Sequence, residues 1–347
     1  MRELTLTPNN PHLQGPTKGT YDADTEQFAF NCTHEMSLLT LPEQISPAGP
    51  PDSGAVDDLV RHSIASSTRV AYQSDLKHFA EWGGALPATP EIIAAYIAAY
   101  AGTLSAATIT RRVATLSKAH QAMGGDNPCQ SALVKATLQG LRRKHGTAQK
   151  QAKALTREDL FAMLNHLADS MKDVRDRALL LVGFAGGFRR SELVGLDVAD
   201  IEHVRQGIII TLRHSKTDQE GAGRKIGIPY GRTRHCPLAA LTDWLTRSGI
   251  TEGAIFRPIT RHGYLQPERL SGDAVSEVIR ERLAAAGLDP EGYSGHSLRA
   301  GFATSAAQAG ASTIKIRQQT GHSSDTMLAR YIRDGELFVG NAAGAIL

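Results

Sequence analysis

Apolar residues recur at helical spacing from about residue 57 onward. The first series predicts a helix with four side chains on one face, at intervals of four, three and three residues: Tyr72, Leu76, Phe79 and Trp82. Ser67 and Thr68 are the candidate N-caps of this helix. Three further helices are predicted, and they begin near Thr89, Ser105 and Ser131. Together the four predict a compact helical domain over residues 56–145, with the aromatic stripe in its core.

The second half of the chain is also mainly helical by pattern. Thr156 is a candidate N-cap, with Asp159 three residues later as in a capping box. The segment from about Val174 to Gly186 is apolar nearly all round, which predicts a buried helix. After residue 237 the pattern predicts helices as far as about residue 334.

Runs of β-branched residues identify one pair of strands. Residues 207–212 read GIIITL, and residues 225–229 read KIGIP after a polar, glycine-rich turn with its tip near residues 219–223. No other segment gives a clear strand signal. The predicted fold class is mainly α (α+β), with an N-terminal helical domain and a mostly helical C-terminal domain, residues 156–335, that holds a small antiparallel β-sheet.

Three segments lack these patterns. Residues 1–55 are rich in Pro, Thr, Asn, Gly and acidic residues, which predicts a disordered extension. Residues 146–155 have no apolar period and predict a linker between the two domains. Residues 336–347 are apolar enough to contact another copy of the chain.

The net charge of +3 divides unevenly along the sequence. Residues 1–55 contain two basic and seven acidic residues, so this segment carries −5 and the remaining 292 residues carry +8. No acidic residue stands between Asp126 and Glu158, a stretch in which basic residues gather: Lys135, Arg142, Arg143, Lys144, Lys150 and Lys153. Such a block is typical of a surface that contacts nucleic acid phosphates, or of a solvated linker.

The composition indicates which class of protein the chain belongs to. With 41% apolar and 21% charged residues, the 347-residue chain is typical of a globular protein, and its length favours two domains. No apolar run approaches the ~18 residues of a membrane span, and the polar start is unlike a signal peptide. Cys32, Cys129 and Cys236 are scattered without a pairing pattern, which favours free thiols in a reducing, cytoplasmic compartment.

The segment GHSLRAGF, residues 295–302, places His296 and Arg299 three positions apart. On a helix these two side chains share one face, and their hydrogen-bond donors suit an anion. The alternative is a solvated helix face. A function of this pair can be inferred only together with other charged or reactive groups in the chain.

Three other segments carry such groups. Arg189 and Arg190 follow a Gly-Gly-Phe bend, with Glu192 one turn beyond; they suit a phosphate site or an ordinary surface pair. Lys216, at the exit of the first strand, could donate a proton to a leaving oxygen or be merely solvated. Residues 321–331 contain a Gly-His pair and, nine residues after the histidine, Tyr331, which is either a core residue or a nucleophile.

Taken in chain order, these residues resemble the tyrosine recombinase (phage integrase) family, in its Cre-like, simple-site subgroup. The matching segments are GFRRSELVGLDVADI, SKT within the hairpin, GHSLRAGFAT and TGHSSDTMLARYI. The helical segments STRVAYQSDLKHFAEW and ATITRRVATLSKAH resemble the core-binding domain of that family, and residues 156–335 resemble its catalytic domain. The resemblance covers about residues 57–335, and its motifs in register make it specific.

The resemblance implies a role for each matching residue. Arg189 and Arg299 clamp the non-bridging oxygens of the scissile phosphate. His322 supports that phosphate, and Glu192 holds the site in shape.

The same resemblance implies the reaction. Tyr331 is the nucleophile and forms a 3′-phosphotyrosyl link, while Lys216 protonates the leaving 5′ oxygen. His296 hydrogen-bonds the phosphate or acts as a base. Strands are exchanged between two recognition sites through a Holliday junction, with no metal or other cofactor.

The implied partner is double-stranded DNA with an inverted-repeat recognition site. The chain is expected to be a monomer in solution and a homotetramer, as two dimers, on DNA, with no membrane association. Basic and polar residues of the N-terminal domain are the expected DNA contacts: Thr110, Arg111, Arg112, Lys118, Arg142, Arg143 and Lys144.

Two positions depart from the family pattern. Arg190 stands where the family usually has an apolar residue, and Arg189 is chosen as the clamp because it precedes Glu192 by three. Thr320 replaces the common Leu before Gly-His, which we interpret as a packing variation.

Two alternative functions stay open. A type IB topoisomerase uses similar chemistry, but that family lacks a histidine just before the second arginine, where this chain has His296. A DNA-binding regulator without catalysis is the other alternative, although it has no need of Tyr331.

Overall fold

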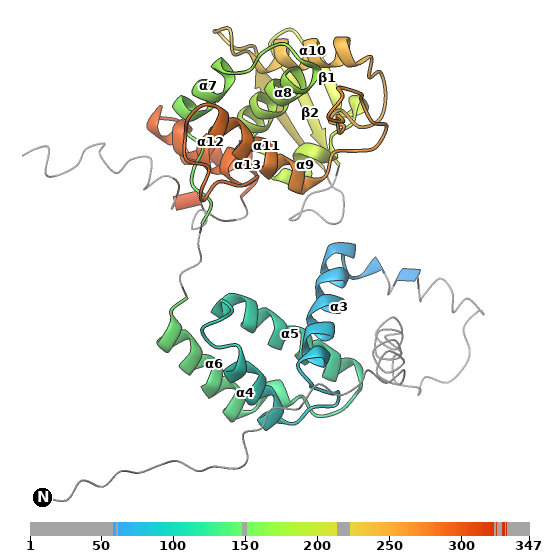
Figure 1. The fold of residues 1–347 in the computed structure, drawn as a ribbon, viewed down its shortest axis with the longest axis vertical. Helices are drawn as coiled ribbons and strands as arrows, with labels where there is room; N and C mark the ends of the chain where they lie inside the picture. Colours follow the sequence, from blue (N-terminus) through green and yellow to red (C-terminus); the bar gives the residue numbers. More distant parts are fainter. Residues whose placement is uncertain are drawn as a thin grey trace, which may run out of the picture. The chain divides into compact units, whose positions relative to one another are not determined.

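The structure is a computed structural model, and it describes residues 58–59, 62–147, 151–213, 223–322, 324, 328–329 and 331. The chain divides into two compact units, Met1–Gln149 and Lys150–Leu347 (Figure 1). Three predictions lie outside the described residues: the disorder of residues 1–55, the position of Lys216 in the hairpin tip, and the contact segment 336–347. Within the described part, no helix is both long and apolar enough to cross a membrane.

Residues 66–145 of the first unit form four helices and one short 3-10 turn (Figure 1): α3 (Ser66–Glu81), α4 (Pro90–Ala99), α5 (Ala106–Ala122), η1 (Pro128–Gln130) and α6 (Ala132–His145). Thr89, Ser105 and Ser131 cap α4, α5 and α6 through their side chains, so these three predicted starts are confirmed. The start predicted for α3 was late, because its N-cap is Ala65, which has no side-chain acceptor.

The core of this unit is the predicted apolar stripe. Phe79, Ile93, Tyr96, Ile109 and Leu116 are each at most 2% exposed. They pack α4 against α6 and α3 against α5. Burial of these aromatic and aliphatic side chains stabilises the unit.

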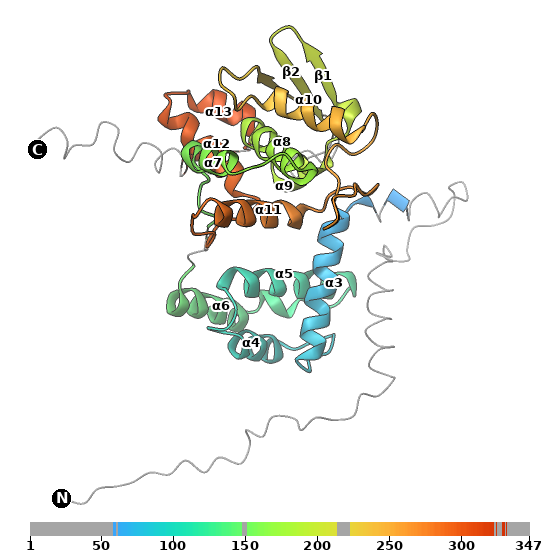
Figure 2. The same cartoon turned by 45° about the horizontal axis from the view of Figure 1, so that its top comes forward.

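The second unit is mostly helical, with a small sheet at one side (Figure 2). Its helices are α7 (Arg157–Asn165), α8 (Met171–Gly186), α9 (Arg190–Gly195), η2 (Val198–Asp200), α10 (Pro237–Ser248), α11 (Gly272–Ala285), α12 (Ser297–Gln308) and α13 (Thr313–Thr320). Helix α8 lies between α10 and α12 and is buried nearly all round, as its apolar sequence predicts. The capping box of Thr156 and Asp159 at the start of α7 is confirmed.

The sheet has three antiparallel strands in the order β1 (Ile201–Val204), β2 (Gly207–Leu212) and β3 (Arg224–Pro229). Ile208 pairs with Ile228 and Ile210 with Ile226, so these four buried side chains share the face toward the core. The hairpin of β2 and β3 is therefore confirmed. Strand β1 was missed, because its sequence IEHV is half exposed and has no apolar alternation.

The prediction of continuous helices after residue 237 was wrong over residues 249–271. This segment is irregular and is held by isolated bridges between Asp197 and Ala254 and between Ile259 and Leu265. The buried indole of Trp244 donates a hydrogen bond to the carbonyl of Ile255 at 2.8 Å. The bridge of Ala254 to Asp197 joins residues 57 positions apart, and the local apolar pattern carries no signal of it.

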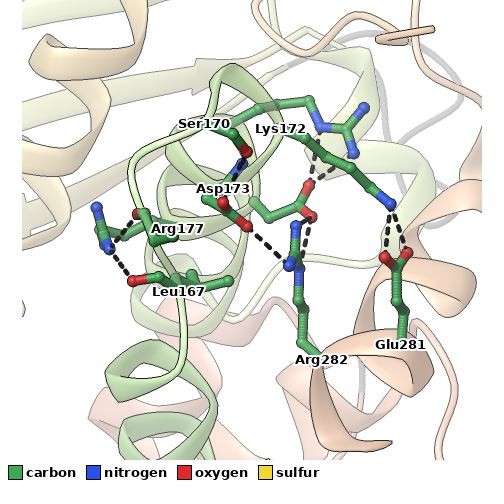
Figure 3. Close-up of polar contacts among 10 residues, drawn as sticks. Leu167, Ser170, Lys172, Asp173, Arg177, Glu281 and Arg282 are labelled. Atoms are coloured by element: carbon green, nitrogen blue, oxygen red, sulfur yellow. Dashed lines mark hydrogen bonds and ion pairs between the residues drawn. The ribbon is translucent and has the colours of Figure 1, made fainter. Parts of the chain in front are cut away.

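A buried ionic network joins α8 to α11 (Figure 3). Asp176 is fully buried and accepts hydrogen bonds from Arg175 at 2.6 Å and from Arg282 at 2.5 Å. Arg282 also lies 2.8 Å from Asp173. Since each buried charge has an opposite partner, the network fixes the position of α11 against α8.

The Asp176→Asn substitution is expected to destabilise the second unit by about 3–5 kcal/mol, because it leaves the buried Arg175 without a carboxylate and Arg282 with Asp173 alone. Urea unfolding measures the change. Lys172→Ala is the control, since Lys172 pairs with Glu281 at the surface (Figure 3) and its loss is expected to cost at most about 1 kcal/mol. Similar small losses in both variants would contradict a structural role for the network.

The last residues of the predicted linker pack against the second unit. The N–H of Leu155 donates to the carbonyl of Ser297 at 3.0 Å, and that of Lys153 donates to Gly292 at 2.8 Å. The Leu155 backbone passes so close to α12 that a Cβ on Gly301 would lie 1.6 Å from the Leu155 oxygen. The glycine in GHSLRAGF is therefore required by this close approach.

The Gly301→Ala substitution is expected to destabilise the second unit by at least about 3 kcal/mol, because the added methyl overlaps backbone that cannot rotate away. Thermal and urea unfolding would reveal the loss. Gly227→Ala is the matched control: its Cβ meets nothing within 4 Å, and a change within about 0.5 kcal/mol is expected. A stable Gly301→Ala protein would show that the helix and the Leu155 segment can separate without cost.

Candidate active site

Glu192 orients Arg189 from two directions. Arg189 is the N-cap of α9, and its backbone N–H donates to Glu192 Oε2 at 2.9 Å. Its Nη1 donates to Glu192 Oε1 at 2.5 Å. Because Glu192 is only 5% exposed, the carboxylate is a fixed part of the core and holds the guanidinium in one direction.

Arg299 is the most deeply buried charge of this region, at 1% exposed. Its Nη1 donates to the carbonyl of Gly187 at 2.9 Å and to the carbonyl of Thr320, which joins α12 to the ends of α8 and α13. No carboxylate of the described residues forms an ion pair with it. Burial and the nearby charge of Arg189 lower the pKa of Arg299 to about 10, so it stays protonated at neutral pH.

The Arg190 guanidinium pairs with α11, although its charge also contributes to the lowered pKa of His296. Its Nη1 is 2.6 Å from Asp273 Oδ1 at the start of α11, and half of its side chain is exposed. Of the two neighbouring arginines, Arg189 is thus the one that the structure brings together with Glu192 and with the segment of Gly321, whose carbonyl accepts from Arg189 Nη2 at 3.4 Å.

Two histidines lie beside these arginines. His296 is the N-cap of α12, and desolvation, followed by the charges of Arg299 and Arg189, lowers its pKa. His322 is 6% exposed, and burial, followed by the same two arginines, lowers its pKa to about 3. Both imidazoles are therefore neutral at pH 7 in the free protein.

Tyr331 lies beside His322. The centroids of the two rings are 5.8 Å apart. The Tyr331 side chain packs against a small cluster formed by Ala303, Ala307, Ile316 and Leu328. The tyrosine is thus half-buried and lies next to the cationic group. A core residue in this place can also be a nucleophile, so the two interpretations of Tyr331 do not exclude each other.

The structure adds Arg224, which sequence reasoning missed. Its Nη1 donates to the carbonyls of Gln318 and Gln319, at 3.0 and 2.7 Å, in the last turn of α13. Its Nη2 lies 3.8 Å from Glu192 Oε2. An arginine at the start of a strand carries no sequence signal of such a role, because only the packing of β3 against α13 brings it to Glu192.

The structure also corrects the interpretation of Thr320 as a packing variation. Thr320 is fully buried, and its hydroxyl makes two polar contacts. It donates to the carbonyl of Ile316 at 2.7 Å, and it lies 2.7 Å from His322 Nδ1. The side chain is therefore a polar support of His322.

Together these residues form a site for an anion. Arg189 and Arg224 lie against one buried carboxylate, Glu192, and the third guanidinium, that of Arg299, has no carboxylate partner among the described residues. Such an excess of positive charge in a mostly buried place is suited to a phosphate group and to the extra negative charge of its transition state. Among the described residues, no group of three or more His, Cys, Asp or Glu side chains could hold a metal ion.

The expected DNA contacts of the first unit divide into two kinds. Lys118 on α5, and Arg142, Arg143 and Lys144 in the last turn of α6, are exposed. Thr110 is half-buried, and its hydroxyl donates to the carbonyl of Ala106 at 2.7 Å. The exposed cations are available to a ligand without any rearrangement.

Arg111 and Arg112 face a buried carboxylate. Asp75 is 2% exposed and lies 2.6 Å from Arg111 Nη1 and 3.6 Å from Arg112 Nε. Thr115 donates to the same carboxylate at 2.8 Å. The Arg112 side chain is only 14% exposed, so its main described contacts are within the unit, whereas half of Arg111 reaches the surface.

The chain is similar in sequence to known proteins. A sequence profile described as "Phage integrase family" matches residues 153–336. The "Integrase/recombinase xerD homolog" of Selenomonas ruminantium is 42% identical over 291 residues, which cover 81% of this chain and 85% of that protein. The "Recombinase cre" of Escherichia phage P1 is 27% identical over 72% of this chain and 77% of that protein.

Comparison with solved structures supports the fold. A crystal structure of lambda integrase (residues 75-356) bound to DNA matches with a TM-score of 0.60 and 20% identity, over 90% of this chain and 98% of that chain. A lambda integrase tetramer bound to a Holliday junction matches with a TM-score of 0.58 and 19% identity, over 91% and 84%. The predicted fold class, mainly helical with a small antiparallel sheet, is confirmed.

Acid is expected to destabilise the second unit through His322. The unfolded chain takes up a proton near the usual pKa of 6.5, whereas folded His322 does so only near pKa 3. Stability therefore rises with pH between these values, and lowering the pH from 7 to 5 is expected to cost about 2 kcal/mol through this residue. Urea unfolding of the protein and of His322→Gln at both pH values measures it; an equal pH effect in the two proteins would contradict the assignment.

Proposed function

Because the chain belongs to the phage integrase family, we propose that its candidate active site cleaves and rejoins DNA through Tyr331. The enzyme is a site-specific DNA recombinase of the tyrosine type. The observation that carries the proposal for the site is the buried Arg299 guanidinium, which has no carboxylate partner among the described residues and lies in one group with Arg189 and His322. A DNA phosphate supplies the missing negative charge.

In the proposed first step, Arg189 and Arg299 hold the non-bridging oxygens of the scissile phosphate. The Tyr331 oxygen attacks phosphorus, its proton passes to the neutral imidazole of His296, and the bond from phosphorus to the 5′ oxygen breaks. Lys216 donates a proton to that oxygen. The products are a 3′-phosphotyrosyl link and a free 5′ hydroxyl, so the bond energy is conserved in the enzyme–DNA link.

The second step reverses the first on a new strand. A 5′ hydroxyl of the partner duplex attacks the phosphotyrosine, and the Tyr331 oxygen leaves and regains a proton. No metal ion or nucleotide is needed, because the positive side chains stabilise the transition state. Two such exchanges, through a Holliday junction, recombine two sites.

We further propose double-stranded DNA with inverted repeats as the substrate, bound by four copies of the chain. A solved lambda integrase structure is a tetramer on a Holliday junction, and a XerH structure with a TM-score of 0.57 contains palindromic DNA. Residues 56–145 act as the core-binding domain and residues 156–335 as the catalytic domain. The exposed Arg142, Arg143 and Lys144 contact the DNA backbone and position the enzyme without reading its sequence.

A covalent-trap experiment tests the function. The protein is incubated with nicked fragments of genomic and plasmid DNA from its source, denatured in detergent, and the attached DNA is sequenced. We expect adducts focused on one inverted-repeat site, and none with Tyr331→Phe, which lacks the attacking oxygen. Tyr264→Phe is the control, because this tyrosine is in the same unit and 70% exposed, and we expect it to form adducts as the unchanged protein does.

The other outcomes separate the alternatives. Adducts without a focus in sequence would favour an activity like that of a type IB topoisomerase. DNA binding without any adduct would favour a regulator that has lost catalysis. Adducts that persist in Tyr331→Phe would overturn the choice of nucleophile.

A further inference from the structure

Proton counting at Thr320 determines the form of His322. The Thr320 hydroxyl has one hydrogen, and its 2.7 Å contact with the carbonyl of Ile316 uses it, because a carbonyl can only accept. The same oxygen lies 2.7 Å from His322 Nδ1. Nδ1 must therefore be the donor in this second bond, and in the neutral ring the remaining nitrogen, Nε2, carries a lone pair and no hydrogen.

The backbone between the two residues makes this contact rigid. Gly321 ends α13 in the left-handed conformation, at a φ of 65°, and turns the chain so that His322 returns over Thr320. This left-handed conformation favours glycine, and a Cβ at position 321 would also have to displace the Arg224 guanidinium, whose Cζ would lie 2.6 Å away. Thr320 itself is held by its carbonyl, which accepts from Arg299.

The charged and titratable groups around His322 come from several elements. Arg299 lies on α12, Arg189 precedes α9, Arg224 begins β3, and the neutral His296 caps α12. On α13, Arg317 Nε donates to the carbonyl of His322 at 3.2 Å, and the Tyr331 ring lies on another side. The nearby positive charges favour a neutral His322 ring in the free protein. A bound phosphate is negative and therefore favours a proton on Nε2 of this ring.

We propose that Thr320 is a positioning residue that holds His322 as the Nδ1–H tautomer and so directs Nε2 to the scissile phosphate. The proposal rests on the proposed function of the site. The threonine oxygen accepts from Nδ1–H before and after phosphate arrives, so the ring keeps one orientation. Nε2 takes a proton from solvent when phosphate binds and then donates it in a hydrogen bond to a phosphate oxygen.

Two substitutions test Thr320. Thr320→Val keeps the branched shape but removes the acceptor, whereas Thr320→Ser keeps the hydroxyl. With ¹⁵N-labelled histidine and the His322 signals assigned through His322→Gln, NMR reports which ring nitrogen carries the hydrogen in the full-length free protein. We expect Nδ1–H in the unchanged protein and in Thr320→Ser, and a shift to Nε2–H in Thr320→Val, because Nδ1–H would be buried without an acceptor.

Strand cleavage supplies the second measurement. With the target site from the covalent trap, we expect Thr320→Val to form the adduct roughly tenfold more slowly at unchanged DNA affinity, and Thr320→Ser to restore most of the rate. Thermal unfolding verifies that both variants are folded. A Thr320→Val protein that keeps the Nδ1–H form and the full rate would overturn the proposal.

The two hypotheses can fail separately. If even the unchanged protein forms no adduct, the proposed function fails. The NMR measurement then still decides whether Thr320 sets the tautomer of His322, because it needs neither DNA nor catalysis.

Discussion

The buried charge of Arg299 is the constraint on which the arrangement of this protein depends. Moving an unpaired guanidinium out of water costs several kcal/mol, so the fold must supply partners or leave a place for an anion. It does both, since the carbonyls of Gly187 and Thr320 accept from the same Nη1 and no carboxylate among the described residues neutralises it. These two bonds join α12 to the C-terminal ends of α8 and α13. Arg189 and His322 follow α8 and α13 by two or three residues, and His296 caps α12.

Other buried arginines of the second unit show the contrasting case. Arg175 and Arg282 lie against Asp176, and Asp173 adds a second carboxylate, so that network is balanced and has no use for a ligand. Charge balance therefore distinguishes the two groups within one unit. The balanced network fixes α11 on α8, whereas the group at the other end of α8 has an excess of positive charge that suits an anion.

The same distinction applies to the first unit, where sequence alone treated all basic residues alike. Arg112 is a member of a buried polar group around Asp75, and its guanidinium also reaches the hydroxyl of Tyr96 at 3.4 Å. Arg142, Arg143 and Lys144, at the exposed end of α6, have no such enclosure. The sequence shows that a residue is basic. Only the fold shows which groups lie beside that residue and pair with it.

The sequence by itself determined the local features: the caps of α4 to α7, the buried helix α8, the β2–β3 hairpin, and the set of residues that identifies the family. Helical period, capping and turn chemistry act within a few residues, so they can be read from the chain. Tertiary structure alone decided the irregular segment 249–271, the contact of Leu155 with Gly301, and the place of Arg224 beside Glu192. Arg224 reaches carbonyls 94 and 95 positions away. Contacts of this kind leave no period in the sequence, because they depend on which surfaces meet after the helices have formed.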